Sequence, residues 1–478
     1  MLNYGGCYNN YDPSDNNFNC NGLINPDRRP NPEIYEVGYY YQNIWTTPVN
    51  LREGKITVFN ENFFRDLSNY RLVWTLMANG KAVKSGSVDN LDIAAQTSKG
   101  YTLYNSLNEI LTGDNSIDEH AEIFLNIEYQ LKSAEPLMAA GQVVAHQQLE
   151  VQGGFLPIAD SRIAPNASKK DLKMKLVNDK KSDKLSVSNG IFTAEFDKTN
   201  GHLTRYDVKG KQMLGAEGTI LPNFWRAVTD NDMGAGLQKK MKVWRNPAIN
   251  FESITLNKGQ KASKKAAVEM GPSVTVTYDM PDVSAKLMMT YEFSENGAMD
   301  VTEKMTVDAS KQIPEMFRFG VMMQLPKSMD KSTFYGRGPI ENYCDRKVSQ
   351  NIGIYTQTAD EQFYTYIRPQ ESGTKSDIRW WKQTDASGFG IEVTSIPFCA
   401  SALHYAVKDL DEGDQKHQRH CEEVPVSPYV NLYLDMEHAG VGGIDSWSRN
   451  AEALPKYRVD YGNKEFHFTI TPIDDTKK

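Results

Sequence analysis

The chain reads Asp12-Pro-Ser-Asp-Asn-Asn-Phe18-Asn-Cys-Asn21-Gly22-Leu-Ile-Asn-Pro-Asp27-Arg28-Arg-Pro-Asn-Pro32-Glu33 near its start, and this stretch predicts a loop that leads into a helix. Its Asp-Pro and Asn-Gly pairs are turn signals. At its end, Asn31 is suited to cap a helix and Pro32 to fill the first helical position, while Glu33 favours the positively charged helix start. We therefore expect a polar loop followed by a helix that begins near residue 32.

The expected helix carries an apolar stripe. Ile34, Val37, Tyr41 and Ile44 follow one another at steps of three and four residues, which is the spacing of one helix face. Residues 1–6, before the loop, are too few for more than the end of one strand. A strand end, a loop and a helix make up half of an α/β unit, which cannot bury its apolar stripe alone. The sequence thus predicts that the chain begins inside a domain whose main body lies elsewhere.

Length, composition and charge narrow the class of protein. The 478 residues suffice for roughly two to four domains. The net charge of −8 gives no basic excess, so we expect no nucleic-acid partner. No run reaches the ~18 consecutive apolar residues of a membrane span, so we expect no membrane association. No signal peptide is predicted, because the start lacks a basic region followed by an apolar one; a cytoplasmic or a periplasmic location stays open.

The cysteines and histidines predict no metal site. The five cysteines are odd in number, widely spaced and without a Cys-x-x-Cys pair, which is typical of free thiols. His417 and His420 lie in a charged run from Asp414 to Glu423, which predicts a solvated loop. The five cysteines are Cys7, Cys20, Cys344, Cys399 and Cys421.

After the expected helix, the period of the apolar residues changes from 3.6 to 2. Leu72, Trp74 and Leu76 alternate with polar neighbours, and Asn79-Gly80 supplies a tight hairpin turn. Several such runs between about residues 48 and 152 predict an antiparallel sandwich of immunoglobulin type. Residues 155 to about 184 have the Pro, Ser and Lys content of a linker. From residue 185 the strands resume almost to the end, as in 190–196, 274–278, 287–293 and 317–325, and they predict one large two-sheet sandwich.

Three clusters of polar and aromatic residues stand out in the large sandwich. Read alone, the Asp-Asn-Asp of the first is a set of turn-forming side chains, because a calcium loop needs more oxygen ligands at defined spacing. The Gly-Arg-Gly-Pro of the second is a tight turn, because no Lys-Ser/Thr and helix follow it. The clusters are Asn223-Phe-Trp-Arg-Ala-Val-Thr-Asp-Asn-Asp-Met-Gly234, Tyr335-Gly-Arg-Gly-Pro-Ile-Glu-Asn-Tyr-Cys-Asp-Arg346 and Gly440-Val-Gly-Gly-Ile-Asp-Ser-Trp447.

Together the clusters resemble the Asn-Phe-Trp-Arg-Ala-Pro-x-Asp-Asn-Asp-x-Gly, Gly-x-Gly-Pro-x-Glu-Asn-Tyr-x-Asp-Arg and Gly-x-Gly-Gly-x-Asp-Ser-Trp signatures of the large β-galactosidases of glycoside hydrolase family 2. The run from Asp15 to Arg28 is similar to the last βα unit of their catalytic barrel. Cys7 departs from the usual Asp after Gly-Gly, and Val228 from the usual Pro. The resemblance covers residues 1–475 and implies a C-terminal portion of such an enzyme.

The resemblance implies a mainly β fold with four parts. Residues 1–45 correspond to a C-terminal fragment of a (β/α)8 TIM barrel, and residues 46–153 to an immunoglobulin-like β-sandwich. Residues 154–184 are a linker. Residues 185–475 correspond to a galactose-mutarotase-like β-supersandwich, the fifth domain of the family.

The resemblance also implies a function in the retaining hydrolysis of terminal β-D-galactosides. Both catalytic glutamates and the magnesium ligands of the family precede residue 1, so no catalytic residue is expected in this chain, and the missing barrel portion is an expected partner. Phe18, by its carbonyl, and Asn21, by its side chain, correspond to ligands of a sodium ion that meets the galactose 6-hydroxyl. Trp447 corresponds to an aromatic platform at the pocket rim, so Asn21 and Trp447 are the candidate substrate-binding residues. The parent enzyme is expected to be an oligomer.

A second function fits the same large sandwich. Supersandwich folds also occur in sugar epimerases and in binding domains, and a fold alone does not decide activity. The alternative is therefore a stand-alone carbohydrate-binding module. The barrel-like residues 1–45 favour the enzyme portion, because a binding module has no use for them.

Overall fold

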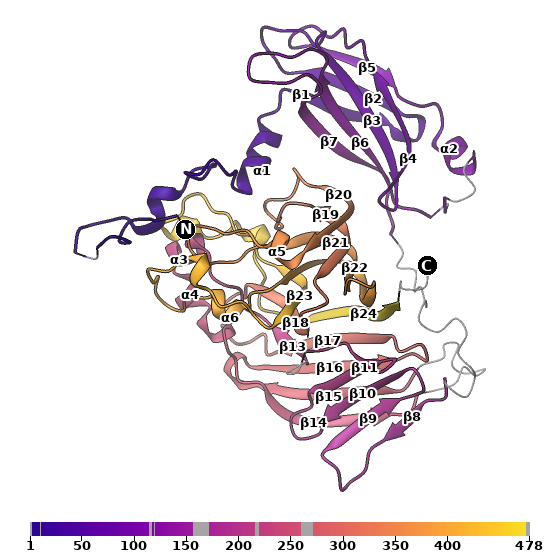
Figure 1. Cartoon of the computed structure of the whole chain (residues 1–478), viewed down its shortest axis with the longest axis vertical. Helices are drawn as coiled ribbons and strands as arrows, with labels where there is room; N and C mark the ends of the chain where they lie inside the picture. The colour runs from indigo at the N-terminus through magenta and orange to yellow at the C-terminus, as the bar shows by residue number, and fades with distance from the viewer. Residues whose placement is uncertain are drawn as a thin grey trace.

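A computed structural model of the chain describes residues 2–9, 11–113, 117–118, 120–155, 172–215, 219–259 and 271–474. We divide it into an N-terminal segment (residues 2–43), a first sandwich (44–152) and a second sandwich (172–474), which follow one another from the indigo to the yellow end of the chain (Figure 1). Residues 156–171 of the linker expected at 154–184 lie outside the described residues, whereas residues 175–177 of its described part form a strand.

The N-terminal segment contains a short 3-10 helix, η1 (Asn16–Cys20), and helix α1 (Glu33–Tyr40). The expectation of a strand end before the loop is wrong for the part described, because residues 2–9 contain no strand. The expected cap is also wrong: Pro32 precedes α1, and no side chain caps it. Asn31 instead accepts a hydrogen bond from Nδ2 of Asn25 at 3.1 Å and one from the hydroxyl of Tyr364.

The apolar stripe of the expected helix is divided between two elements. Helix α1 ends at Tyr40, and Ile44 begins strand β1 (Ile44–Asn50), where it is 2% exposed in the core of the first sandwich. The prediction that Ile44 belongs to the helix face is therefore wrong. Its spacing fits a helix, but the burial available in the adjacent sandwich decides its structure. Ile34 and Val37 remain on the helix and are half-buried.

The first sandwich packs two antiparallel sheets. Among the described residues, one sheet has the order β1-β2-β5 and the other the order β4-β3-β6-β7. In β3 every second residue is buried, including Leu72, Trp74 and Leu76, which confirms the predicted alternation. Asn79 and Gly80 have φ of 45° and 77° and join β3 to β4, which confirms the predicted turn. The other elements are β2 (Lys55–Asn60), β3 (Tyr70–Ala78), β4 (Lys81–Val88), β5 (Ser98–Thr102), α2 (Leu107–Gly113), β6 (Ile123–Leu131) and β7 (Val143–Gln152).

The second sandwich packs a small sheet on a large one. The described strands of the small sheet have the order β12-β11-β10-β9-β8. Its strands are β8 (Lys175–Val177), β9 (Lys184–Ser188), β10 (Phe192–Asp197), β11 (Leu203–Val208) and β12 (Lys211–Gln212).

The large sheet has the order β13-β18-β23-β22-β24-β17-β16-β15-β14 among its described strands, and β21, β19 and β20 extend it from β22. Its strands are β13 (Ile220–Asn223), β14 (Asn250–Asn257), β15 (Ser273–Met280), β16 (Ala285–Phe293), β17 (Met299–Val307), β18 (Arg318–Pro326), β19 (Lys331–Gly338), β20 (Asn351–Thr358), β21 (Lys375–Thr384), β22 (Phe389–Leu403), β23 (Tyr429–His438) and β24 (Lys464–Asp474).

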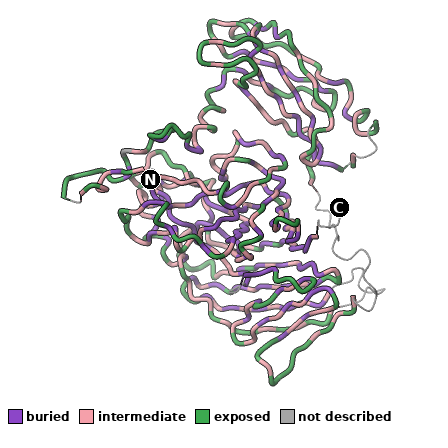
Figure 2. Tube along the Cα trace, viewed as in Figure 1, coloured by how far each residue is buried: buried purple, intermediate pink, exposed green. Residues whose placement is uncertain are grey.

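One core lies between the two sheets of the second sandwich. Phe192 of the small sheet stacks on Phe293 of the large sheet, with ring centroids 5.7 Å apart. Figure 2 shows buried residues concentrated on the inner strands and exposed ones at the loops and outer edges. Short helices connect the strands: α3 (Asp230–Gly234), α4 (Leu237–Lys240), α5 (Ala359–Gln362) and α6 (Val407–Leu410). The strands expected at 190–196, 274–278, 287–293 and 317–325 coincide with β10, β15, β16 and β18 to within two residues.

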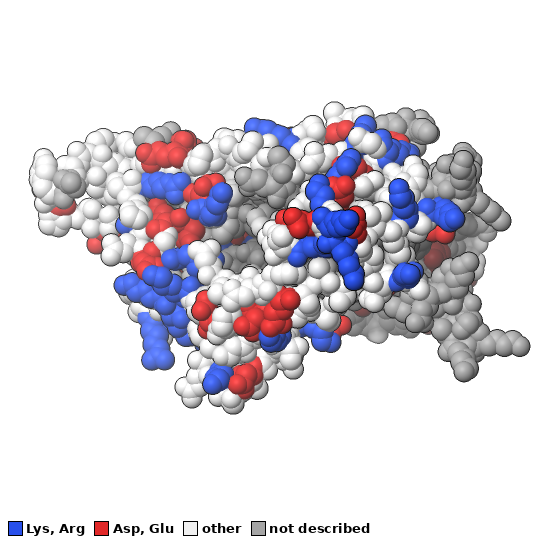
Figure 3. Space-filling model, turned by 90° about the horizontal axis from the view of Figure 1, so that it is seen from below, with Lys and Arg blue, Asp and Glu red and all other residues white. Residues whose placement is uncertain are grey.

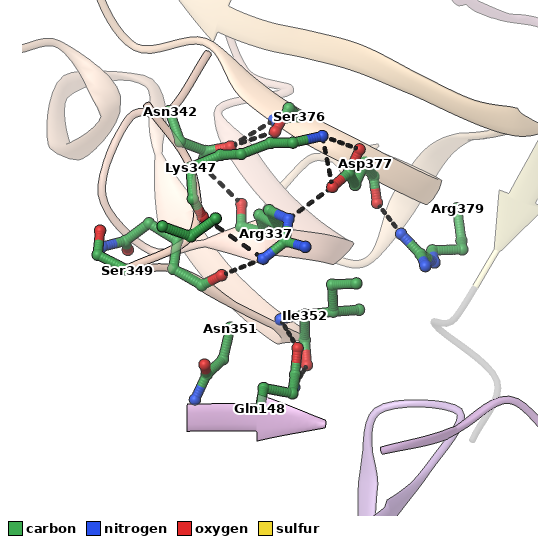
Figure 4. Close-up of polar contacts among 12 residues, drawn as sticks. Gln148, Arg337, Asn342, Lys347, Ser349, Asn351, Ile352, Ser376, Asp377 and Arg379 are labelled. Atoms are coloured by element: carbon green, nitrogen blue, oxygen red, sulfur yellow. Dashed lines mark hydrogen bonds and ion pairs between the residues drawn. The ribbon is translucent and has the colours of Figure 1, made fainter. Parts of the chain in front are cut away.

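The two sandwiches are joined by polar contacts and a small apolar cluster. Gln148 of β7 accepts the backbone N–H of Ile352 and donates to its carbonyl, both at 2.8 Å (Figure 4). The guanidinium of Arg379 donates to both carboxylate oxygens of Glu122, at 3.0 and 2.6 Å. Beside this pair, Phe124 of the first sandwich packs with Tyr335 and Ile352 of the second.

The charged side chains of the second sandwich are of both signs. Seen from below, Lys and Arg side chains lie among Asp and Glu side chains (Figure 3). On the small sheet, for example, Arg205 pairs with Asp207 at 2.5 Å and lies 3.6 Å from Glu195. No helix of the described residues is long and apolar enough to cross a membrane.

Candidate functional site

A pocket of about 650 Å³ lies between the N-terminal segment and loops of the second sandwich. Its walls come from the loop around η1, from α1, from the start of α3, and from sandwich residues far apart in the sequence. The lining sandwich stretches are 341–346, 366–371 and 441–446, together with Lys416. The pocket therefore exists only because the N-terminal segment is held against the second sandwich.

Asp230 anchors the η1 loop to the sandwich. Its carboxylate accepts hydrogen bonds from Nδ2 of Asn17 at 2.6 Å and from Nε of Arg368 at 3.1 Å, and it pairs with Lys416 at 2.7 Å. Burial by itself would raise the pKa of Asp230, but the positive charges of Arg368 and Lys416 outweigh burial and lower it. The carboxylate thus stays charged and connects three separate parts of the chain.

Arg346 connects helix α1 to Glu341 of the second sandwich. Its guanidinium donates to Glu33 of α1 at 2.7 Å and to Glu341 at 2.6 Å. Glu341 also accepts the backbone N–H of Gly373 at 2.7 Å and the hydroxyl of Tyr366. Burial raises the pKa of Tyr366, and the nearby charge of Glu341 raises it further, so this hydroxyl remains a donor. A second α1 residue, Glu36, accepts the backbone N–H groups of residues 348 and 349.

The glycine-rich loop 440–447 is held by two carboxylates. Asp345 accepts the backbone N–H of Gly442 at 2.8 Å, and a Cβ at Gly440 would collide with this carboxylate unless Asp345 shifted. Asp445 accepts the hydroxyl of Ser448 at 2.6 Å and the backbone N–H of Trp447 at 3.2 Å. These local bonds order the loop although few of its side chains are buried.

The loop presents Trp447 at the edge of the pocket. Trp447 is 67% exposed, and its ring meets the ring of Phe18 edge to face, with centroids 5.6 Å apart. Phe18 is itself 44% exposed and lines the pocket, as does Asn21. The structure therefore brings together two residues that are 429 positions apart and that were singled out separately in the sequence.

The Asp-Asn-Asp cluster (230–232) is hydrogen-bonded to the glycine-rich loop. The hydroxyl of Thr229 accepts the N–H of Asp232 and the Asp232 carboxylate accepts the N–H of Thr229, so the two residues cap α3. Asp232 also pairs with the buried guanidinium of Arg226 at 2.7 Å. Nδ2 of Asn231 donates to the carbonyl of Asp445 at 3.2 Å. Among the described residues, no group of three or more His, Cys, Asp or Glu is arranged to hold a metal ion.

The Gly-Arg-Gly-Pro cluster lies away from the pocket, close to the first sandwich. Arg337 donates to Asp377 at 2.5 Å and to the carbonyl of Gln350 at 2.8 Å, and Lys347 pairs with Asp377 at 2.9 Å (Figure 4). The two positive charges lower the pKa of Asp377 although its burial acts in the opposite direction. These bonds order the loop after β19, and the following residues Glu341, Tyr343, Asp345 and Arg346 line the pocket.

Sequence reasoning missed the role of the charged run 414–423. The expectation that His420 is solvated is wrong, because its side chain is buried at 6% exposure against Tyr4 and Cys7. Lys416 of the same run pairs with Asp230 inside the pocket. Nothing in the local pattern distinguishes these two residues from solvated ones, because their partners are far away in the sequence.

Comparison with known proteins identifies the family. Residues 188–471, more than half of the chain, match the model of the family described as beta galactosidase small chain. The chain belongs to this family. Residues 56–152 match a second model, described as beta-galactosidase, domain 4, which corresponds to most of the first sandwich.

Relatives extend the likeness to the whole chain. The β-galactosidase of Priestia megaterium is 32% identical over 99% of this chain and 42% of that protein. The β-galactosidase of Halalkalibacterium halodurans is 28% identical over 98% of this chain and 43% of that protein. The chain therefore spans less than half the length of these curated relatives. A galactose mutarotase related enzyme from Lactobacillus acidophilus covers 62% of this chain and 99% of its own, with 9% identity and a TM-score of 0.34.

Proposed function

We propose that this chain is the C-terminal part of a retaining β-galactosidase that hydrolyses terminal β-D-galactosides. In this proposal it supplies the rim of the substrate pocket and a loop for a sodium ion, and an upstream barrel portion supplies the catalytic glutamates. Support comes from the likeness to β-galactosidases along the whole chain.

One structural observation carries the proposal. The N-terminal segment is bonded into the second sandwich through Asp230 and Arg346, so Phe18 and Asn21 lie on the same pocket as the loop that bears Trp447. The exposed ring of Trp447 is suited to pack against the C–H face of a sugar while the sugar hydroxyls stay hydrated. A stand-alone binding module would not need a segment bonded in this way.

The sodium site is part of the proposal, with Phe18 and Asn21 as its ligands from this chain. Carbonyl and amide oxygens are ligands that suit a hard cation. The side chain of Asn21 is exposed, and it forms no hydrogen bond within the described part of the chain, so its oxygen is free to coordinate. A sodium ion held there would attract a sugar hydroxyl, the galactose 6-hydroxyl by resemblance. Magnesium would belong to the upstream portion alone.

The contacts of the pocket carboxylates support the proposal that the upstream portion, and not this chain, supplies the two catalytic carboxyl groups. A retaining glycosidase needs two carboxyl groups about 5 Å apart, one as nucleophile and one as acid and base. Each pocket carboxylate of this chain is engaged by a cation or by N–H groups, as described above for Asp230, Glu33, Glu36, Glu341 and Asp345. The sixth, Glu371, accepts bonds from Arg318 at 3.1 Å and Thr374 at 2.8 Å.

The exposed face of the N-terminal segment is where we place the upstream portion. Helix α1 has no fully buried residue, and several tyrosines of the segment present their rings to solvent. Exposed rings of this kind are available for contact with another part of the protein. They are Tyr8 (84% exposed), Tyr11 (81%), Tyr35 (41%), Tyr40 (60%) and Tyr41 (80%).

The test is reconstitution of activity. We expect the purified chain to hydrolyse a chromogenic β-galactoside no faster than a heat-inactivated control. Activity should appear when the chain is co-expressed with the portion of the Priestia megaterium enzyme that precedes the matched region. Turnover by the chain alone would contradict the proposed division. Galactoside binding by the chain alone, without activity in any combination, would favour a carbohydrate-binding module.

A further inference from the structure

The sulfur of Cys7 is surrounded by three nitrogen atoms. Sγ lies 3.3 Å from Nε2 of His420, receives a hydrogen bond from Nε2 of Gln418 at 3.3 Å, and receives another from the backbone N–H of Tyr4 at 3.1 Å. The amide and the backbone N–H only donate, and donors stabilise a negatively charged sulfur. The imidazole is a base within reach of the thiol proton, which is the arrangement of an activated nucleophile.

The imidazole is held in place from several sides. His420 is 6% exposed, and its ring packs against that of Tyr4 with centroids 4.7 Å apart. Its backbone N–H donates to Glu423 at 2.7 Å. The hydroxyl of Tyr4 donates to the carbonyl of Arg419 at 2.7 Å and accepts the N–H of the same residue at 2.8 Å. The Cys7–His420 contact therefore belongs to an ordered junction between two distant parts of the chain.

Three of the other cysteines have hydrogen-bond acceptors beside their sulfur atoms, whereas Cys7 has donors. The thiols of Cys344 and Cys421 donate to backbone carbonyls at 3.3 and 3.1 Å, and that of Cys20 to the carbonyl of Asn3 at 3.8 Å. A carbonyl oxygen accepts the S–H proton and so favours the neutral thiol. Burial raises the pKa of Cys344 to about 11 and that of Cys421 to about 12, and it also raises the pKa of Cys399. Cys7, which is half-buried, differs from all four in its surroundings.

We propose that Cys7, with His420 as its base, is a modification site for low-molecular-weight disulfides. Nε2 of His420 takes the thiol proton, and the Cys7 sulfur attacks one sulfur of the disulfide. A new S–S bond forms as the old one breaks, and the other half leaves as a thiolate that takes up a proton. Cys7 is oxidised to a mixed disulfide, and one half of the reagent is reduced to its thiol.

A group attached at Cys7 would act close to the proposed pocket. Gln418 also donates to the carbonyl of Gly5 at 3.2 Å, and the N–H of Gly5 donates to the carbonyl of Asn16 at 3.0 Å. Asn16 begins η1, which contains Phe18. A group attached to the Cys7 sulfur would thus displace Gln418, which is also bonded to Gly5. Gly5 in turn is bonded to Asn16, the first residue of η1.

The test is the relative reactivity of the cysteines in the full chain. The chain is treated with iodoacetamide at pH 7, and the alkylation rate of each cysteine is followed by mass spectrometry of its peptide. We expect Cys7 to react at least about tenfold faster than Cys20, a half-buried thiol of the same segment. In a second arm, oxidised glutathione should form a mixed disulfide at Cys7 first, and dithiothreitol should reverse it.

Two variants test whether the reactivity of Cys7 comes from its contacts with His420 and Gln418 or only from its exposure to solvent. His420→Gln removes the base and should slow alkylation of Cys7 about tenfold while leaving Cys20 unchanged. Gln418→Glu, at an exposed position, replaces a donor to the sulfur by a carboxylate and should slow Cys7 several-fold even if the first variant fails to fold. The proposal is overturned if Cys7 reacts no faster than Cys20, if Gln418→Glu leaves its rate unchanged, or if oxidised glutathione modifies another cysteine first.

Discussion

Trp447 and Trp381 differ in how much of each ring is exposed. Trp447 projects from a glycine-rich loop and is 67% exposed. Trp381 lies in β21, is 0% exposed, and stacks on Phe334 with ring centroids 4.8 Å apart. At the scale of single residues, the position of a tryptophan therefore decides its role. In the loop its ring is exposed and can contact a ligand, whereas in the strand it packs in the core.

The first prediction concerns these two tryptophans. Trp447→Ala should change the free energy of unfolding by at most about 0.5 kcal/mol, because an exposed ring loses little burial. Trp381→Ala, the matched control, should cost about 3–5 kcal/mol through the cavity it leaves. Denaturant titration followed by circular dichroism measures both. In the reconstituted enzyme, Trp447→Ala should weaken galactoside binding or turnover without abolishing hydrolysis. Unchanged kcat and KM, or early unfolding of Trp447→Ala, would rule out its role at the rim.

The second prediction concerns Asp435, a fully buried residue of β23. Burial raises the pKa of Asp435 to about 7, against the attraction of Arg318, whose Nε lies 3.7 Å from the carboxylate. In the unfolded chain the pKa is near 3.8, so between these values the folded state binds a proton that the unfolded state does not. The protonated Asp435 therefore stabilises the folded state fully below the unfolded pKa. As pH rises from there towards the folded pKa, the free energy of unfolding falls by up to ~1.4 kcal/mol per pH unit.

The variant Asp435→Asn tests this effect. Asn resembles the protonated acid, so the variant should gain stability relative to the wild type as pH rises from 5 to 7.5. The comparison is needed because the buried His438, whose pKa is lowered by burial, has the opposite pH dependence in both proteins. Urea titrations at several pH values measure the difference in unfolding free energy. A difference that stays constant with pH would contradict the prediction.

At the scale of elements, the N-terminal segment and strand β18 are stabilised by different means. The segment is held by individual polar contacts, such as the hydrogen bond from Nδ2 of Asn25 to the hydroxyl of Tyr364 at 2.7 Å. Strand β18 pairs with β13 on one side and β23 on the other, and most of its residues are buried. Few buried apolar contacts allow local opening, whereas a central strand opens only with the whole sandwich.

The third prediction follows from this contrast. Hydrogen exchange at residues 3–25 should be at least about tenfold faster than in β18. Tyr364→Phe removes hydrogen bonds worth ~1 kcal/mol each and should speed exchange of this segment about fivefold or more. Tyr41→Phe, at a ring that is 80% exposed, is the control and should change nothing. Protection in the segment equal to that of β18 would show that it folds as one unit with the sandwich.

At the scale of the molecule, the two sandwiches share a buried ion pair. The side chains of Arg379 and Glu122 are 8% and 5% exposed, and Glu122 also accepts the hydroxyl of Tyr335 at 2.6 Å. Removing one partner of such a pair leaves an unpaired buried charge, which costs far more than the loss of an exposed pair.

The fourth prediction tests this junction. Glu122→Ala should destabilise the docked sandwiches by about 3–5 kcal/mol, because Arg379 and Tyr335 lose their common acceptor. Calorimetry should then detect the first sandwich unfolding earlier than the second. Glu465→Ala breaks an exposed pair with Lys304 and should cost at most about 1 kcal/mol. Equal effects of the two substitutions would mean that the pair does not couple the sandwiches.

Local pattern alone determined the β architecture. The alternation in β3 and the Asn79-Gly80 turn are encoded within a few residues, because a half-buried strand needs an apolar residue at every second position. The three motif clusters likewise carried the family resemblance, which the matches to residues 56–152 and 188–471 now support. These features could be predicted because each depends on residues that are neighbours in the sequence.

Only the tertiary structure decided which distant residues meet. Ile44 fits the spacing of a helix but packs into a sandwich core, and His420 lies in a charged run but is buried beside Cys7. The edge-to-face contact of Phe18 and Trp447 joins the two ends of the chain. The physical reason is that burial and electrostatic pairing depend on which surfaces come together in three dimensions, and no local period records that information.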